Sequence, residues 1–155
     1  ITKSDKESVI ALFNYYIEHT NAAFLESPLP SSYFDVLLPV IEQYPSVSVK
    51  ENGALIGFGL LRPHNPMPAF RNTAVISYFL DPAYTGKGIG SKMLNFLIEK
   101  AREKGIRSIL AEISSLNPGS VRFHEKHGFI HCGRFERVGV KNGNEFDTIW
   151  MQKSL

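Results

Sequence analysis

The order of apolar and polar residues along the chain predicts four helices and six strands. In the helical segments apolar side chains recur three and four residues apart, as Leu94, Leu97, Ile98 and Ala101 do. In the strands apolar residues alternate with polar ones or form a β-branched run such as "TAVISYFL". The predicted helices cover residues 4–17, 32–43, 91–104 and 117–127, and the predicted strands cover residues 46–51, 54–61, 73–80, 106–113, 129–140 and 145–155.

Turn and cap residues mark where these elements end. Asn52-Gly53 and Asn142-Gly143 have the composition of tight hairpin turns, and Gly105 suits the C-terminus of the third helix. Pro39 is expected to kink or shorten the second helix. Helices alternate with strands only in the middle of the chain. The order therefore predicts a mixed α/β protein of the α+β class and not a doubly wound sheet.

The composition is that of an ordinary globular protein and excludes several classes. The 155 residues, 43% of them hydrophobic and 21% charged, suit a single domain over residues 1–155. A net charge of +2, with basic and acidic residues interleaved, does not indicate a nucleic-acid partner. No apolar run is long enough to span a membrane, so no membrane partner is expected. Cys132 is the single cysteine, which favours a reducing, cytoplasmic compartment, and we expect its thiol to be buried.

The segment "YTGKGIGSKM", residues 84–93, holds three alternating glycines between a predicted strand and a predicted helix. A P-loop needs Gly-Lys followed by Ser or Thr, and the dinucleotide fingerprint needs a wider last spacing of its glycines, so neither pattern fits. Alternating glycines before a helix N-terminus instead aim several backbone amides into one concavity, which favours an anion. The segment therefore predicts a phosphate-binding loop, with a plain glycine turn as the alternative.

Together with "NPGSVRFHEKHGF", the segment "VISYFLDPAYTGKGIGSKML" resembles the GCN5-related N-acetyltransferase (GNAT) superfamily. Shorter stretches, "NYYIEHTNAAFLESP", "AFRNTA" and "VGVKNGNEFDTIWMQ", resemble the phosphinothricin and methionine-sulfoximine acetyltransferase subgroup. The resemblance covers nearly the whole chain and implies a GNAT fold, with a central, mostly antiparallel twisted sheet flanked by helices. It also implies acetyl-coenzyme A (acetyl-CoA) as cosubstrate, no metal, and a homodimer.

By this resemblance, two segments and one asparagine would bind the cofactor. The amides of residues 86–91 would wrap the pyrophosphate, and residues 78–80 would pair with the pantetheine arm in a slot opened by a β-bulge. Asn117 would reach the pantetheine, although a simple helix N-cap explains it equally well. The superfamily's Arg or Gln at the first loop position is Thr85 here, so the remaining contacts must carry more of the binding. The predicted cofactor residues are Tyr78, Phe79, Leu80, Gly86, Lys87, Gly88, Ile89, Gly90, Ser91 and Asn117.

Acetyl transfer to an amine needs a base for the amine, a donor for the thioester oxygen and a donor for the departing thiolate. The subgroup has a glutamate where this chain has Val75, so Glu26 in "FLESP" is the candidate base, with a solvated loop carboxylate as the alternative. A backbone N–H near Phe79 or Leu80 would serve the oxygen. His124 stands where the subgroup has histidine, and an imidazole can donate a proton near neutral pH; a satisfied core or surface histidine is the alternative.

Five side chains are expected to contact the acceptor amine. Phe70 matches a subgroup tyrosine, and Arg71 could hold a carboxylate through two hydrogen bonds. Core packing and solvent exposure are the ordinary alternatives for aromatic and basic residues of this kind. His124, His127 and His131 lack the spacing of a metal site, so no metal ligand is predicted. The predicted acceptor residues are Phe24, Phe70, Arg71, Val75 and Ser77.

The sequence thus predicts an acetyl-CoA-dependent N-acetyltransferase for a small-molecule amine that attacks the thioester directly in a ternary complex. An amino acid, or an analogue of the phosphinothricin or methionine-sulfoximine type, is the best candidate acceptor. Three alternatives remain open. They are a non-catalytic acyl-CoA-binding sensor or interaction module of GNAT fold, an acetyltransferase for protein N-termini or lysines, and a nucleotide-binding regulator.

Overall fold

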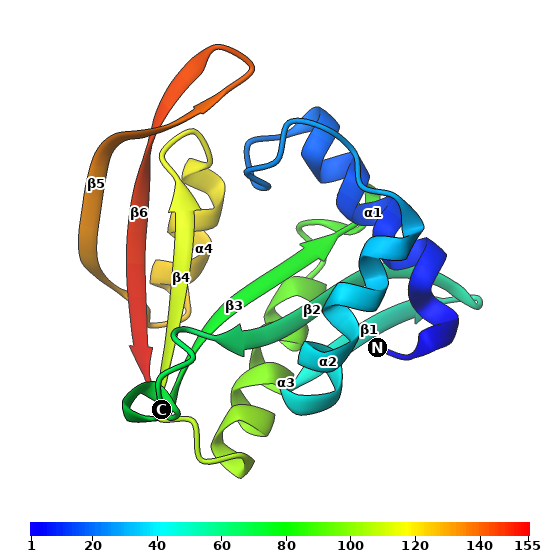
Figure 1. Cartoon of the computed structure of the whole chain (residues 1–155), viewed down its shortest axis with the longest axis horizontal. Helices are drawn as coiled ribbons and strands as arrows, with labels where there is room; N and C mark the ends of the chain where they lie inside the picture. The colour runs from blue at the N-terminus through cyan, green and yellow to red at the C-terminus, as the bar shows by residue number, and fades with distance from the viewer.

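The computed structural model describes residues 1–155 as one six-stranded sheet with helices on both faces (Figure 1). The strand order is β1-β2-β3-β4-β6-β5. The strands are β1 (Ser46–Glu51), β2 (Ala54–Pro63), β3 (Thr73–Leu80), β4 (Ser108–Ser114), β5 (Ile130–Lys141) and β6 (Asn144–Ser154). The α-helices are α1 (Lys6–His19), α2 (Phe34–Gln43), α3 (Ile89–Glu103) and α4 (Pro118–Lys126), and short 3-10 turns cover Lys3–Asp5, Ser31–Tyr33, Pro68–Phe70 and Pro82–Tyr84.

The sheet is antiparallel except between β3 and β4, as the predicted fold class requires. This one parallel pairing joins only residues 73–75 to residues 108–110. Beyond it the two strands diverge, and β3 leads toward α1 while β4 runs beside β6 (Figure 1). The sheet is therefore open between β3 and β4 over the second half of each strand.

The bulge predicted in β3 is absent, and the opening arises without it. β3 pairs with β2 in unbroken register from Ala74 to Leu80. Gly57 and Gly59 of β2 allow this close pairing, because a Cβ atom there would lie 2.9 Å from Leu80 Cδ1 and 2.8 Å from Tyr78 Cβ. β3 thus stays with β2, and it is the separation from β4 that creates the slot.

Two apolar clusters hold the layers together. One lies between the sheet and α3, where Leu94 and Leu97 pack against Ile109 and Ala111 of β4. The other joins α1 and α2 to the front of β2 through residues that include Val9, Phe34 and Phe58. The front of β4, β6 and β5 carries no helix (Figure 1). This uncovered part of the sheet faces the α1 side across the opening.

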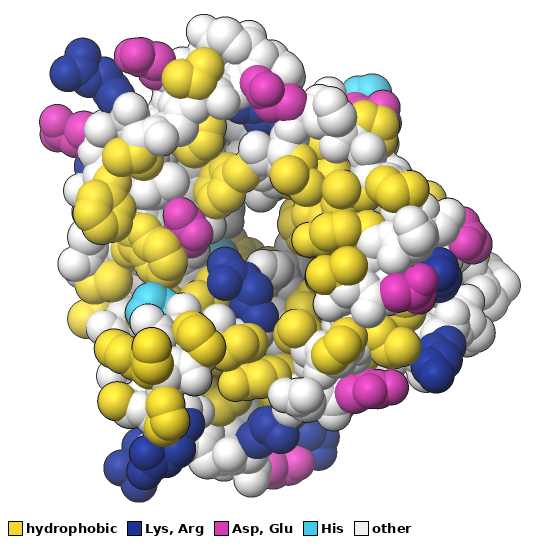
Figure 2. Space-filling model, in the orientation of Figure 1, with side chains coloured by type: hydrophobic (Ala, Val, Ile, Leu, Met, Phe, Trp, Pro, Cys, Tyr) yellow, Lys and Arg dark blue, Asp and Glu magenta, His cyan; other side chains and the backbone are white.

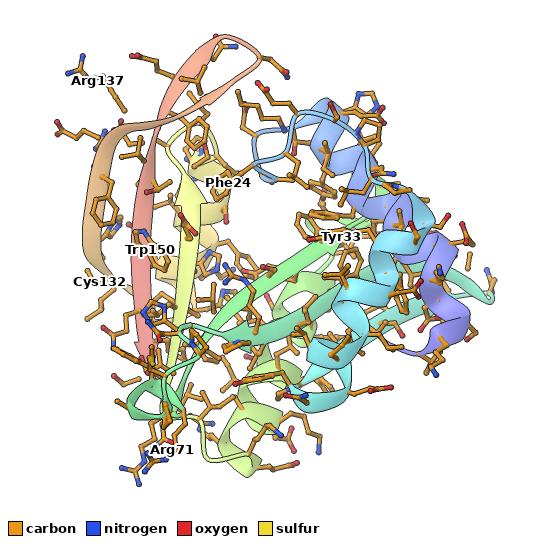
Figure 3. The ribbon with its side chains drawn as sticks, viewed as in Figure 1. Phe24, Tyr33, Arg71, Cys132, Arg137 and Trp150 are labelled. Carbon is orange, nitrogen blue, oxygen red and sulfur yellow. The ribbon has the colours of Figure 1, made fainter.

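The prediction that Cys132 is buried is wrong. Its side chain is exposed, because β5 is an edge strand that has no helix over it and whose residues 130–138 are all exposed. Figure 3 shows Cys132 at the outer side of this strand. Among the helices, none is both long and apolar enough to cross a bilayer.

Candidate active site

A cavity of about 560 Å³ fills the opening between β3 and β4 and continues to the N-terminus of α3. Residues 76–80 of β3 and 111–114 of β4 form its two sides, and α4 closes its back with Ser120, Phe123 and His124. Of the ten predicted cofactor residues, eight line this cavity: Tyr78, Phe79, Leu80, Gly86, Gly88, Gly90, Ser91 and Asn117. Thr85 also lines it, whereas Lys87 and Ile89 do not.

The facing edges of β3 and β4 are the main feature of this cavity. Their ladder ends at Val75 and Leu110, so the backbone groups beyond these residues on the facing edges have no strand partner. Strand edges of this kind satisfy themselves by pairing with an extended ligand. The cavity therefore offers a slot for a chain of amide groups.

The glycine loop at the end of the slot is suited to an anion. Gly86 has φ +74° and Gly88 has φ +79°, which are left-handed values that side chains rarely adopt. A Cβ atom at either position would meet nothing within 4 Å, so the loop faces open space. Gly88 is also the N-cap of α3, and the first amides of that helix have no intrahelical acceptor. The positive end of the α3 helix dipole and the free backbone amides thus lie at the same place.

The lysine that lines the cavity is not the predicted one. Lys87 turns back over the ring of Tyr84, with Nζ 5.0 Å from the ring centroid, while Lys126 in the last turn of α4 lines the cavity. Nothing in the sequence near Lys126 signals this role, because it depends on how α4 packs beside α3. Ser91 is also engaged, since its Oγ lies 2.9 Å from Nε2 of His127.

Asn117 is observed as the N-cap of α4. Its side-chain oxygen accepts a hydrogen bond from the Ser120 amide at 3.2 Å. Because it lines the cavity as well, the two predicted roles are compatible: the oxygen caps the helix and the amide nitrogen remains for a ligand.

His124 lies beneath β3 and is buried at 3% exposure. Its Nδ1 lies 2.8 Å from the carbonyl oxygen of Ser120, which can only accept, so Nδ1 carries the proton. Nε2 must then accept the hydrogen bond from the Tyr78 hydroxyl, at 2.8 Å. Burial lowers the pKa of His124 below its usual value of 6.5 and raises the pKa of Tyr78 well above 10. The imidazole is therefore neutral and has no free N–H, unlike the proton donor that the sequence predicted.

Glu112 is a carboxylate of the site that sequence analysis missed. It lies on β4, lines the cavity and is half-buried. Burial raises its pKa above the ordinary 4.5, and Arg62 opposes part of that rise. A single acidic residue within the apolar strand "SILAEIS" was the available signal.

A second cavity, of about 460 Å³, lies on the uncovered front of the sheet and also touches Glu112. Residues from β4, β5, β6 and the loop after α1 line it, and they are Phe24, Glu112, Phe135, Val138, Gly139, Val140, Phe146, Thr148 and Trp150. Phe24 stacks on Phe146 with ring centroids 5.5 Å apart and an interplanar angle of 16°. In Figure 2 a hollow separates the two halves of the molecule, with hydrophobic side chains on both of its walls.

Glu26 is not brought to either cavity. It is exposed, and its Oε1 accepts a hydrogen bond of 2.7 Å from the backbone amide of Asn142 in the β5–β6 turn. The predicted base thus supports a turn, because its loop folds across the end of the hairpin and not into the slot.

Lys141, beside that turn, anchors the same loop through buried hydrogen bonds. It is 2% exposed, and its ammonium donates hydrogen bonds of 2.7 Å to the carbonyl oxygens of Ile17, Thr20 and Ala23. Burial lowers the pKa of this lysine, and Glu26 partly offsets the effect. Lys141 therefore fixes the C-terminal end of α1 and the segment that leads to Phe24.

The predicted acceptor residues separate into two groups. Phe24 lines the second cavity and Ser77 lines the first. Val75 is buried in the sheet, and Phe70 and Arg71 lie in and beside a 3-10 turn that contributes to neither cavity. Figure 3 shows Arg71 at the end of the molecule opposite Phe24. The chain contains no group of three or more His, Cys, Asp or Glu residues placed to hold a metal ion.

Comparisons with known proteins agree with this arrangement. An L-methionine sulfoximine/L-methionine sulfone acetyltransferase from Salmonella typhimurium is 32% identical over 99% of this chain and 91% of its own length. A phosphinothricin acetyltransferase from Sinorhizobium meliloti, solved in complex with acetyl-CoA, superposes with a TM-score of 0.95 at 27% identity, covering 100% of this chain and 85% of that one.

A ribosomal-protein-alanine N-acetyltransferase from Brucella melitensis superposes with a TM-score of 0.94 at 29% identity, covering 100% of this chain and 97% of that one. The sequence model of the acetyltransferase (GNAT) family matches residues 11–129. The predicted superfamily is thereby confirmed, and the relatives include the predicted subgroup. This chain belongs to the GNAT family of acetyltransferases.

Proposed function

We propose that this chain transfers the acetyl group of acetyl-CoA to the amine of a small molecule, with an amino acid or amino-acid analogue as acceptor. The observation that carries the proposal is the slot between β3 and β4, which has unpaired strand edges along it and an anion-binding glycine loop at its end. Pantetheine is an extended chain with amide groups, and it leads to a pyrophosphate. The names of the relatives support the acceptor class.

The residues present fit acetyl-CoA at both ends of the slot. The amides of the first turn of α3 and of the loop before it would hold the pyrophosphate, with Lys126 adding positive charge. The open edge of β3 would pair with the pantetheine, and the amide nitrogen of Asn117 would contact it from the other side. A free N–H of β3 near Phe79 would also donate to the thioester oxygen as it gains charge.

Glu112 is the residue that we assign as the base in place of Glu26. It touches both cavities, so an amine in the second cavity would meet a thioester in the first beside this carboxylate. Its raised pKa makes it a stronger base than an exposed carboxylate. In the reaction, Glu112 takes a proton from the acceptor ammonium and the free amine attacks the carbonyl carbon. The C–N bond forms, the C–S bond breaks, and the proton that the new amide nitrogen sheds neutralises the thiolate.

We assign Tyr78 and His124 to the stabilisation of the departing thiolate. The neutral imidazole holds the Tyr78 hydroxyl in the cavity, and this hydroxyl can turn from Nε2 to the sulfur as charge develops there. Because burial keeps Tyr78 protonated, it acts as a hydrogen-bond donor and does not become a phenolate. His124 is then a positioning residue for Tyr78.

A homodimer is part of the same proposal. β5 is an edge strand, and four of its apolar side chains are 57–67% exposed: Ile130, Phe135, Val138 and Val140. An edge with such side chains is a natural contact for a second copy. Phe135, Val138 and Val140 also line the second cavity, so a second copy at this edge would cover the outer side of that cavity. Sedimentation of the purified chain would show a single dimeric species, and a monomer at micromolar concentration would contradict this part.

A thiol-release assay with acetyl-CoA and a panel of amines tests the function. Release that depends on a small amine and yields the acetylated amine is the expected result. Acetyl-CoA binding without release by any amine would favour the non-catalytic sensor, and release only with peptides that begin with alanine would favour protein acetylation, as the Brucella neighbour's name suggests. Tighter binding of ATP than of coenzyme A would indicate a nucleotide-binding regulator.

A further inference from the structure

We propose that the second cavity binds the side chain of the acceptor and selects an apolar or aromatic side chain over an anionic one. This inference rests on the proposed function and adds the chemical class of the acceptor to it. It is carried by the lining of the cavity, by the position of its one charged residue and by its connection to the slot.

The inner walls of the cavity are mostly apolar and buried. Phe146 and Thr148 are each 7% exposed, and the ring of Phe24 stacks on Phe146. Trp150 stands on the same face of β6, two residues from Thr148, and Figure 3 shows it below Phe24 on the uncovered front of the sheet. Aromatic walls of this kind bind flat or branched apolar groups most favourably.

Charge inside the cavity acts against an anion. Glu112 is the one charged side chain among the lining residues, and no lysine or arginine lines the cavity. A carboxylate or phosphinate on the acceptor's side chain would lie beside another negative charge in an apolar environment, and would lose its hydration without gaining a partner. An uncharged side chain meets no such penalty, and the acceptor's ammonium gains from the same carboxylate.

The cavity also has the right connection to the chemistry. Glu112 borders both cavities, so a molecule whose amine lies at this carboxylate can extend its side chain into the second cavity and present nitrogen to the slot. Arg62, the cation that acts on Glu112, lies on β2 beside Val75, where the β3–β4 ladder ends. It is available for the α-carboxylate of an amino acid, outside the apolar walls.

Trp150 is the single tryptophan of the chain and lines this cavity, so its fluorescence can report on binding there and does not require turnover. Titration with L-leucine in the presence of coenzyme A should change the emission at saturation, with a dissociation constant about 10- to 100-fold lower than that for L-glutamate or phosphinothricin. The values of kcat/KM should follow the same order. Isopentylamine, which lacks the carboxylate of leucine, separates the contribution of the side chain from that of Arg62.

The outcomes distinguish this inference from the proposed function. Turnover that favours glutamate or phosphinothricin would overturn the inference and leave the acetyltransferase intact. Turnover of leucine without any change in Trp150 emission would overturn it as well, because the side chain would then bind elsewhere. If Trp150 emission changes with protein concentration but with none of the amines, a second copy of the chain occupies the cavity, and the inference is wrong. No emission change and no thiol release with any amine would count against both proposals.

A charge introduced at the rim should reverse the preference. Phe24→Arg places a cation at a side chain that is 42% exposed, and it should raise kcat/KM for glutamate relative to leucine by about 10-fold or more. Phe96→Arg is the matched control, since Phe96 is 40% exposed on α3 and lines neither cavity. An equal shift in both variants, or none in Phe24→Arg with the fold intact, contradicts the inference.

Discussion

The two sides of the candidate site are built in opposite ways. The cofactor side consists mostly of backbone: the open edge of β3, the glycine loop and the first amides of α3 follow one another within residues 76–91. The acceptor side consists of side chains that come from the loop after α1, from β4 and from the β5–β6 hairpin. A backbone site tolerates changes of most side chains but no change of its glycines, whereas a side-chain site can be altered one residue at a time.

Gly88→Glu should have the largest effect, and only on the cofactor side. The residue has φ +79°, and a glutamate there would place negative charge at the N-terminus of α3. We expect acetyl-CoA to bind about 100-fold more weakly or not at all, measured by calorimetry. Gly105→Glu is the matched control, because Gly105 also has φ +79° and open space around it but follows the C-terminal end of α3. Equal loss of binding in both variants would mean that backbone strain, and not the anion site, is responsible.

Glu112→Gln should have the next largest effect, at the point where the two sides meet. Loss of the base should lower kcat/KM by roughly 10²-fold while acetyl-CoA binding is kept. The wild-type rate should fall at low pH as Glu112 becomes protonated, and the variant should lack this acidic limb. A larger loss of kcat/KM in Glu26→Gln than in Glu112→Gln would mean that Glu26 is the base, as the sequence predicts.

The same variant should be more stable than the wild type at neutral pH. The pKa of Glu112 is raised in the folded protein, so the folded state binds the proton more tightly than the unfolded state and stability falls as pH rises through this range. Above it the ionised carboxylate destabilises the fold, and glutamine removes that effect. Thermal melts should show a gain of roughly 1–2 °C at pH 7 that disappears below about pH 4. A lower melting temperature at pH 7 would contradict the direction of this pKa shift.

Lys141→Met should affect mainly the acceptor side, and more moderately. Three carbonyl oxygens at the end of α1 and in the loop after it lose their donor, which should cost about 2–4 kcal/mol of stability. Because the loop that carries Phe24 is released, KM for the acceptor should rise about 10-fold. Ala22 of the same loop lines the first cavity, so the dissociation constant of acetyl-CoA should rise too, but by no more than about twofold. Lys50→Met is the control: Lys50 pairs with Asp5 far from both cavities, and its loss should leave KM unchanged. A rise in both constants together would indicate general loosening.

Cys132→Ser should have the smallest effect, since it lies outside both sides. The thiol is exposed on β5, so it should react at once with a thiol reagent in the native protein. Its replacement should change stability by no more than about 0.5 kcal/mol and leave kinetics unaltered. A thiol that reacts only after unfolding would contradict its exposure, unless dilution to the monomer restores the reaction and so shows that a second copy covers β5.

This contrast also explains what could be predicted from the sequence. The helices, strands and hairpin turns follow from local periodicity, and the glycine loop needs only its own residues and the elements on either side of it. Glu112 and Lys126 were missed because their roles arise from the divergence of β3 from β4 and from the packing of α4, which no local pattern records. Cys132 was misjudged because an apolar strand segment looks alike whether it lies at the edge of a sheet or within it.

The ammonium of Lys141 has a consequence for the order in which the enzyme becomes complete. Its three carbonyl partners precede it by 118 to 124 residues. During synthesis, these carbonyl groups therefore stay bound to water until Lys141, at the end of β5, has emerged. The glycine loop draws on nearer neighbours and can form before then, whereas β4, which forms one side of the slot, also needs its partner β6 from the last hairpin. A nascent chain that stops short of the last hairpin would possess the glycine loop but would lack most of the residues that line the second cavity.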